Sequence, residues 1–188
     1  MNKTGTLSYA EQVAQELSRT AAGISAAELE ELAERIAGAG RIFVAGAGRS
    51  GLVAKAFAMR LMQLGLDSHI VGDTVTPSAG PEDLLLIGSG SGETKGLISI
   101  AEKAAKLGTA VAAVTTAPQS TIGKLASVVV TLPGASKEQG EGSYRTIQPM
   151  GTLYEQTLLV FYDAVVLQLM DKLAMTTEAM LERHANLE

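Results

Sequence analysis

Residues 83–94 read Asp-Leu-Leu-Leu-Ile-Gly-Ser-Gly-Ser-Gly-Glu-Thr, and this stretch decides the fold class. Its first half is a short apolar run with the length of a buried strand, and its second half is a turn rich in glycine and serine. A helical pattern follows over residues 95–107 and stops at Gly108. A strand, a tight turn and a helix in this order are typical of a βαβ unit. The stretch therefore predicts an α/β fold.

The same pattern recurs on both sides of this stretch. Upstream, residues 41–45 form a β-like run, residues 46–51 turn the chain, and a helix is expected over residues 52–64, with Gly65 just past its end. The other expected elements are strands at 68–71, 110–114 and 128–132 and a short helix at 121–125. Strands separated by helices imply a parallel sheet covered on both faces. We therefore expect a five-stranded parallel sheet within residues 41–132.

Helices are expected at both ends of this core. Two lie within residues 1–38, because Ser8-Tyr9-Ala10-Glu11 and Ser25-Ala26-Ala27-Glu28 both match the capping box. A long helix is expected over residues 152–182, after a polar, glycine-rich loop at 133–149. The whole chain, residues 1–188, is expected to form a single domain.

The expected last helix is apolar on most of its surface. Between residues 158 and 170 its polar residues are Tyr162, Asp163 and Gln168. A helix of this kind is normally buried on several sides. In so small a domain, a subunit interface is the natural cover, so we expect residues 151–182 to mediate a homo-oligomer.

Composition excludes several classes of function. Hydrophobic residues make up 46% of the 188 residues, and the net charge of −5 argues against nucleic acid as a partner. The absence of cysteine excludes disulfides, thiolate metal ligands and a cysteine nucleophile. The apolar stretch at 158–170 is too short for a membrane span, and the N-terminus lacks an apolar signal core. We expect a cytoplasmic protein without a membrane partner.

The first glycine-rich turn is Gly46-Ala47-Gly48-Arg49-Ser50-Gly51. It matches G-x-G-x-x-G, so a dinucleotide site has to be considered, with Asp73 roughly where a ribose-binding acid would lie. The alternative is that the glycines simply let a strand turn into a helix. That alternative leaves Arg49 unexplained, since a cation in such a loop suits an anionic ligand. Gly48, Arg49 and Ser50 are therefore candidate substrate-binding residues.

The second turn gives the stronger signal. Ser89, Ser91 and Thr94 offer three hydroxyl groups, and Gly90 and Gly92 leave backbone N–H groups open at the start of a helix. A helix cap needs one hydroxyl, so three favour a phosphate-binding cup over an ordinary cap. No Gly-Lys-Ser/Thr follows, so this is not a nucleotide P-loop. Both turns follow strands and meet at the edge where open parallel sheets bind ligands.

These motifs resemble a known family, the sugar isomerase (SIS) domain. The chain is similar to the 6-phospho-3-hexuloisomerases of that family from end to end. The segments that carry the resemblance are 46–51, 74–77, 83–94, 148–155 and 183–188. The serine-rich turn specifies the superfamily, whereas the run at 149–155 and the tail narrow it to this enzyme.

The resemblance implies a flavodoxin-like sheet and conversion of D-arabino-3-hexulose 6-phosphate to fructose 6-phosphate. This reaction belongs to formaldehyde fixation by the ribulose monophosphate pathway, downstream of 3-hexulose-6-phosphate synthase. The resemblance also implies a tetramer and no metal or organic cofactor. Alternatives are another SIS isomerase, such as one acting on arabinose 5-phosphate, a non-catalytic sugar-phosphate-binding protein, or, more distantly, an NAD-dependent dehydrogenase.

Moving a ketone from C3 to C2 requires a base that removes the C2 proton and returns one to C3 through a cis-enediol. Placement and resemblance together indicate Glu155, although a first-turn acid also suits the helix dipole. The resemblance further suggests that His184, carried into a neighbouring subunit, transfers the proton between O2 and O3. Against this, a residue four positions from the end normally lies in a frayed tail.

Overall fold

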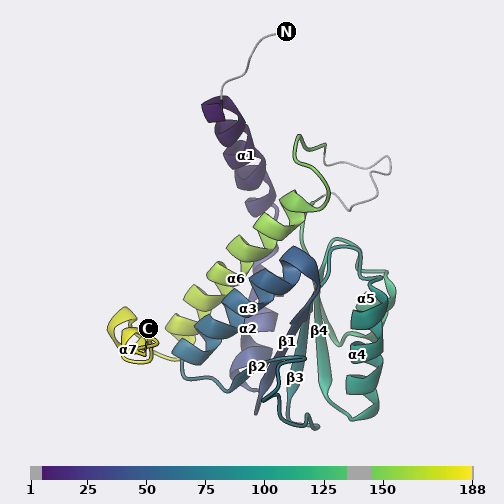
Figure 1. The fold of residues 1–188 in the computed structure, drawn as a ribbon, viewed down its shortest axis with the longest axis vertical. Helices are drawn as coiled ribbons and strands as arrows, with labels where there is room; N and C mark the ends of the chain where they lie inside the picture. The colour runs from purple at the N-terminus through teal and green to yellow at the C-terminus, as the bar shows by residue number, and fades with distance from the viewer. Residues whose placement is uncertain (1–5, 135–144, 188) are drawn as a thin grey trace.

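The computed structural model describes residues 6–134 and 145–187 (Figure 1). Within these ranges the strands form one five-stranded sheet in the order β2-β1-β3-β4-β5, and all neighbouring strands are parallel. The strands are β1 (Ile42–Gly46), β2 (Ser68–Ile70), β3 (Leu84–Gly88), β4 (Ala110–Thr115) and β5 (Val128–Thr131). The predicted α/β fold with a parallel sheet is confirmed, with strand ends shifted by about one residue.

Helices cover both faces of the sheet (Figure 1). They are α1 (Thr6–Ala21), α2 (Ala26–Ala37), α3 (Gly48–Gln63), α4 (Lys95–Lys106), α5 (Thr121–Leu125), α6 (Thr152–Lys172) and α7 (Thr177–Leu181). One core cluster joins α2, α3 and α6 to the sheet, and a second joins α4 and α5 to the opposite face. The central strand β3 serves both, because Leu84 and Leu86 point into the first cluster and Leu85 and Ile87 into the second.

The two predicted capping boxes have different outcomes. Ser25 caps α2, since its hydroxyl oxygen accepts a hydrogen bond from the Glu28 N–H. The Glu28 carboxylate does not close the box, but accepts from the Thr131 N–H of β5 at 2.8 Å. The prediction that Ser8 caps a helix is wrong, because α1 begins at Thr6 and Ser8 lies inside it.

The prediction of one helix from 152 to 182 is also wrong. Helix α6 ends at Lys172, and Ala174 adopts a left-handed conformation with φ of 50°. The Met175 N–H then bonds to the Met170 carbonyl at 2.8 Å, which is the Schellman pattern of a helix end. A short helix, α7, restarts behind the cap residue Thr176. The predicted loop at 133–149 lies largely outside the described residues.

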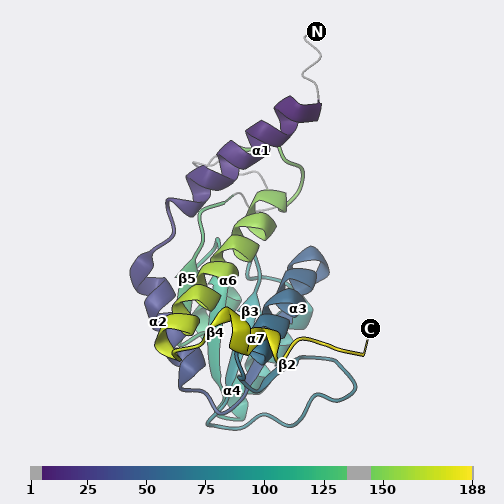
Figure 2. The same cartoon turned by 90° about the vertical axis from the view of Figure 1, so that its left-hand side faces the viewer.

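Helix α6 is buried along most of its length between α1, α2 and α3 (Figure 2). Its exposed side still carries Leu159 and Leu167, on either side of Asp163 along the helix. Leu52 and Met59 of the neighbouring α3 are exposed as well. Among the described residues, no helix has the length and apolar character needed to cross a membrane.

Candidate active site

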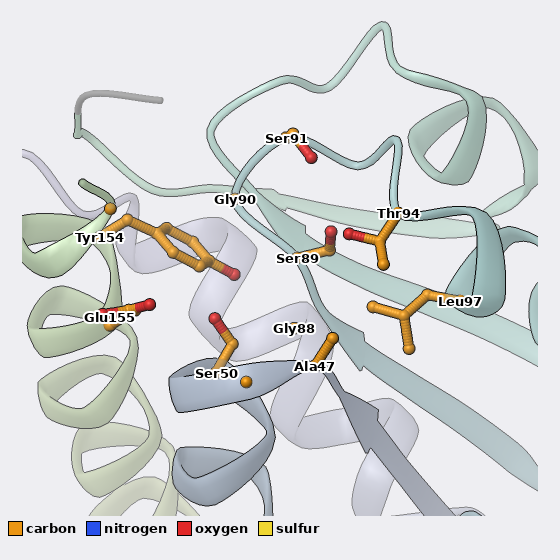
Figure 3. Close-up of a pocket in the computed structure, with 12 residues that line it drawn as sticks. Ala47, Ser50, Gly88, Ser89, Gly90, Ser91, Thr94, Leu97, Tyr154 and Glu155 are labelled. Atoms are coloured by element: carbon orange, nitrogen blue, oxygen red, sulfur yellow. The ribbon is translucent and has the colours of Figure 1, made fainter. Parts of the chain in front are cut away.

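A pocket of about 270 Å³ lies at the carboxyl edge of the sheet, beyond the ends of β1 and β3 (Figure 3). Gly46 and Gly88 end these two strands side by side in register. The chain leaves β1 toward one edge of the sheet and β3 toward the other, so the loops after them diverge and leave a crevice. The lining residues are Ala47, Gly48, Ser50, Gly88, Ser89, Gly90, Ser91, Thr94, Leu97, Gly151, Tyr154 and Glu155.

Three helices begin at this pocket without a side-chain cap. Their N-cap residues are Ala47 for α3, Thr94 for α4 and Gly151 for α6, and all three line the pocket. By contrast, side chains cap α2, α5 and α7, through Ser25, Ser120 and Thr176. The first N–H groups of α3 and α4 therefore remain available to a ligand. In α6 the Thr152 N–H donates to the Pro149 carbonyl at 3.2 Å, so the available groups there begin at the next residue. Three positive helix ends around one cavity favour an anion.

The predicted phosphate-binding turn forms one wall of the pocket. The Ser89 hydroxyl accepts a hydrogen bond from the Gly92 N–H, and the Ser91 hydroxyl accepts one from the Glu93 N–H, each at 3.2 Å. Both hydroxyls act as acceptors here and keep their own protons to donate. Thr94 lies on the same wall, close to Ser89 (Figure 3). The structure therefore brings Ser89, Gly90, Ser91 and Thr94 together as predicted.

Gly92 shapes this turn but does not line the pocket. Its φ is +62°, and a Cβ atom there would lie 1.9 Å from the Ser120 hydroxyl oxygen. Glycine is therefore required for the turn to pass this point. The Gly92 carbonyl accepts from the Ile122 N–H, which joins the turn to α5.

Glu93 does not line the pocket. Its carboxylate accepts hydrogen bonds from the Thr121 N–H at 2.7 Å and the Thr121 hydroxyl at 2.9 Å. These bonds lower the pKa of the Glu93 carboxyl, with the backbone bond as the largest cause. Glu93 precedes the N-cap Thr94 and so lies outside the first turn of α4.

The first glycine-rich turn contributes Gly48 and Ser50 to the pocket, whereas Arg49 points to α6. Helix α3 begins at Gly48, earlier than the predicted residue 52, so all three candidates lie in its first turn. The Arg49 guanidinium donates to the Thr152 hydroxyl at 3.1 Å and pairs with the Glu155 carboxylate at 3.2 Å. Asp73 pairs with Lys55 outside this pocket, so the acid required by a dinucleotide site is missing from it.

Glu155 lies in the first turn of α6 with its carboxylate at the pocket wall opposite Thr94 (Figure 3). Its side chain is 11% exposed. The preceding residue, Tyr154, was missed by sequence reasoning. The Tyr154 hydroxyl donates to the Val114 carbonyl at 2.7 Å, and burial raises its pKa well above the ordinary value. Its ring packs against Gly90, where a Cβ atom would lie 3.0 Å away.

His184 lies away from the pocket of its own chain. It is exposed behind α7. The neighbouring Arg183 guanidinium lies against Gly65, just past the C-terminal end of α3, whereas the pocket is at the N-terminal end of that helix. Figures 1 and 2 place α7 at the end of α6 remote from its first turn. A role for His184 in a neighbouring subunit stays a prediction.

With this geometry established, comparison with known proteins defines the class. The family model described as the SIS domain matches residues 35–160. This chain belongs to the SIS domain family, and the resemblance seen in its sequence is confirmed.

Specific relatives narrow the comparison further. The 3-hexulose-6-phosphate isomerase of Bacillus subtilis (strain 168) is 54% identical, and the match covers 97% of this chain and 99% of that protein. The 3-hexulose-6-phosphate isomerase of Mycobacterium gastri is 47% identical, with 94% and 88% covered. A Methanococcus jannaschii structure with an inferred function of 3-hexulose-6-phosphate isomerase has a TM-score of 0.82 at 32% identity, and 96% and 99% of the two chains are covered. The predicted enzyme class, an isomerase, is confirmed by these relatives.

Proposed function

We propose that this isomerase converts D-arabino-3-hexulose 6-phosphate to fructose 6-phosphate. The observation that carries the proposal is a single pocket with an anion cup on one wall and a carboxylate on the other. The names of the two curated relatives support the choice of substrate.

The phosphate group binds at the wall formed by the β3–α4 turn. Open N–H groups at the start of α4 and the hydroxyls of Ser89, Ser91 and Thr94 donate to its oxygens. The carbon chain of the sugar then extends across the pocket, past Ser50, toward α6. This orientation keeps the phosphate dianion away from the Glu155 carboxylate, which would repel it.

Glu155 acts as the base on the carbon chain. It removes the proton from C2, the C2–C3 bond becomes the double bond of a cis-enediol, and the carbonyl at C3 becomes a hydroxyl. The O2 hydroxyl then gives up its proton as the carbonyl forms at C2, which balances the proton taken up by O3, and Glu155 returns its own proton to C3. Arg49 orients the carboxylate through their ion pair and supplies positive charge near the oxygens where negative charge develops.

We further propose that the active form is a homo-oligomer, a tetramer, in which a neighbour supplies His184 to move the proton between O2 and O3. The exposed Leu159 and Leu167 of α6, with Leu52 and Met59 of α3, support a subunit interface on this face. The exposed position of His184 at the remote end of the chain agrees with a role outside its own pocket. Cytoplasmic location and a link to 3-hexulose-6-phosphate synthase stay predictions.

An assay of the purified protein tests the proposed function. Incubation with 3-hexulose 6-phosphate is expected to produce fructose 6-phosphate, and treatment with a chelator should leave the rate unchanged. Arabinose 5-phosphate is the comparison substrate. Turnover of that sugar alone would assign a different SIS isomerase, and binding of both sugars without turnover would make the protein a sugar-phosphate-binding protein.

A further inference from the structure

The carbonyl of Gly90 is the focus of a hydrogen-bond cluster behind the anion cup. It accepts from the Thr116 N–H at 3.1 Å, from the Thr116 hydroxyl at 2.9 Å and from the Thr115 hydroxyl at 3.0 Å. Thr115 ends β4 and is buried, and Thr116 is half-buried beside it. Neither threonine lines the pocket, whereas Gly90 and Ser91 both do.

These hydrogen bonds fix the orientation of the Gly90–Ser91 peptide group, to which the carbonyl belongs. The Gly90–Ser91 peptide is trans, so its C=O and N–H point in opposite directions. With the carbonyl held against Thr115 and Thr116, the Ser91 N–H points away from them. Among the described residues, this N–H has no acceptor. It is thus a free donor beside the Ser89, Ser91 and Thr94 hydroxyls.

Such a restraint matters because glycine tolerates either orientation of the peptide. A flip of the Gly90–Ser91 peptide turns ψ of Gly90 and φ of Ser91, and Gly90 has no Cβ atom to restrict its part of that rotation. A flipped peptide would direct the carbonyl oxygen at the bound phosphate and repel it. The Tyr154 ring restrains the other side of Gly90, where a Cβ atom would lie 3.0 Å from it.

We propose that Thr115 and Thr116 are positioning residues that hold the Gly90 carbonyl away from the pocket and so preset the Ser91 N–H as a phosphate donor. They act through the backbone and touch no substrate. The inference rests on the proposed function in taking the ligand to be a sugar phosphate. The same positioning role would apply to any phosphate monoester, or to inorganic phosphate, bound at this turn.

Thr116→Val removes a hydroxyl while keeping the shape of the side chain. The expected result is a rise in KM for the sugar phosphate of about two- to tenfold, with kcat changed by less than about twofold, because one hydrogen bond behind the binding site is lost. The inhibition constant or dissociation constant of inorganic phosphate should rise by the same factor. Thr115→Val combined with Thr116→Val should raise both further, and Thr116→Ser should restore them.

Thr109→Val is the matched control. The Thr109 hydroxyl is buried and donates to the Gly80 carbonyl at 2.9 Å, before the start of β4 and away from the pocket. It should lower stability without changing KM or phosphate affinity. If the double variant does not fold, Thr116→Val carries the test, because the Thr116 hydroxyl has no described partner other than Gly90.

The outcomes separate this inference from the proposed function. Unchanged KM and unchanged phosphate affinity in Thr116→Val, in a protein that otherwise isomerises the sugar, would overturn the positioning role alone. Phosphate affinity that falls in Thr116→Val, in a protein inactive toward 3-hexulose 6-phosphate, would support the positioning role and reject the proposed substrate. No phosphate binding by the unaltered protein would overturn both.

Discussion

Arg49 and Glu155 form an ion pair at the wall of the pocket. The guanidinium lies 3.2 Å from the carboxylate, and a second hydrogen bond to Thr152 anchors it to the same helix turn. This ion pair ties the first turn of α3 to the first turn of α6. Both proposed catalytic functions, proton transfer and stabilisation of negative charge, therefore depend on a contact between residues more than 100 positions apart in sequence.

Glu155→Gln tests the base. The amide keeps the size of the side chain but cannot accept a proton, so we expect turnover to fall by about 100-fold or more while substrate still binds. Exchange of the C2 proton with solvent, followed by NMR, should be lost to the same extent. Asp171→Asn removes a carboxylate from the exposed far end of α6 and is the control that should remain active. C2 exchange at a near-normal rate in Glu155→Gln would place the base elsewhere.

At the scale of elements, the helix ends explain which boundaries were predictable. Helices α3 and α4 both end in Schellman motifs with a left-handed glycine, Gly65 or Gly108, and both ends were predicted. Helix α6 ends in the same motif, but its left-handed residue is Ala174. Alanine gives no local stop signal, so the apolar pattern indicated a helix that continues.

Ala174→Gly should stabilise this helix end. Alanine in the left-handed conformation costs about 1–2 kcal/mol, part of which glycine recovers while adding entropy to the unfolded chain. We expect a net gain of about 0.5–1 kcal/mol in the free energy of unfolding, measured with urea. Ala164→Gly, inside α6, should have the opposite sign because glycine weakens a helix interior by about 1 kcal/mol. Equal losses in both variants would contradict the strain assigned to Ala174.

The helices α3, α4 and α6 begin at the pocket without a side-chain cap. Each of α3, α4 and α6 gives up a stabilising side-chain cap where it meets the pocket. Relative to a polar cap, alanine, as at Ala47, costs about 1 kcal/mol of stability, and glycine, as at Gly151, costs roughly a few tenths of that. Three such omissions at one site indicate that the open N–H groups serve a ligand, whose binding would then offset part of that cost.

At the scale of the whole molecule, the long helix α6 separates Glu155 from His184. Its 21 residues span about 30 Å, with Glu155 near one end and α7 beyond the other. One chain therefore cannot place both groups on the same sugar in this arrangement. A site that uses both must combine two subunits.

Mixing two inactive variants tests this arrangement. Glu155→Gln and His184→Ala should each lose most activity alone, whereas mixed oligomers should regain part of it, because some sites then combine an intact Glu155 with a neighbour's intact His184. Light scattering reports the oligomer in each sample. Placing Leu167→Glu in both chains should separate the subunits and abolish the recovery. Full activity of His184→Ala alone would instead assign His184 to the frayed tail.

The sequence by itself determined the parallel α/β sheet and the two glycine-rich turns, because each depends on neighbouring residues: an apolar run, a glycine turn and a helix start. The sequence also indicated Glu155 as the candidate base. The tertiary structure alone decided that Arg49 pairs with Glu155, that Tyr154 and Gly151 complete the pocket, and that Thr115 and Thr116 hold Gly90. These contacts join segments far apart in the chain, and their geometry follows from how the helices pack on the sheet.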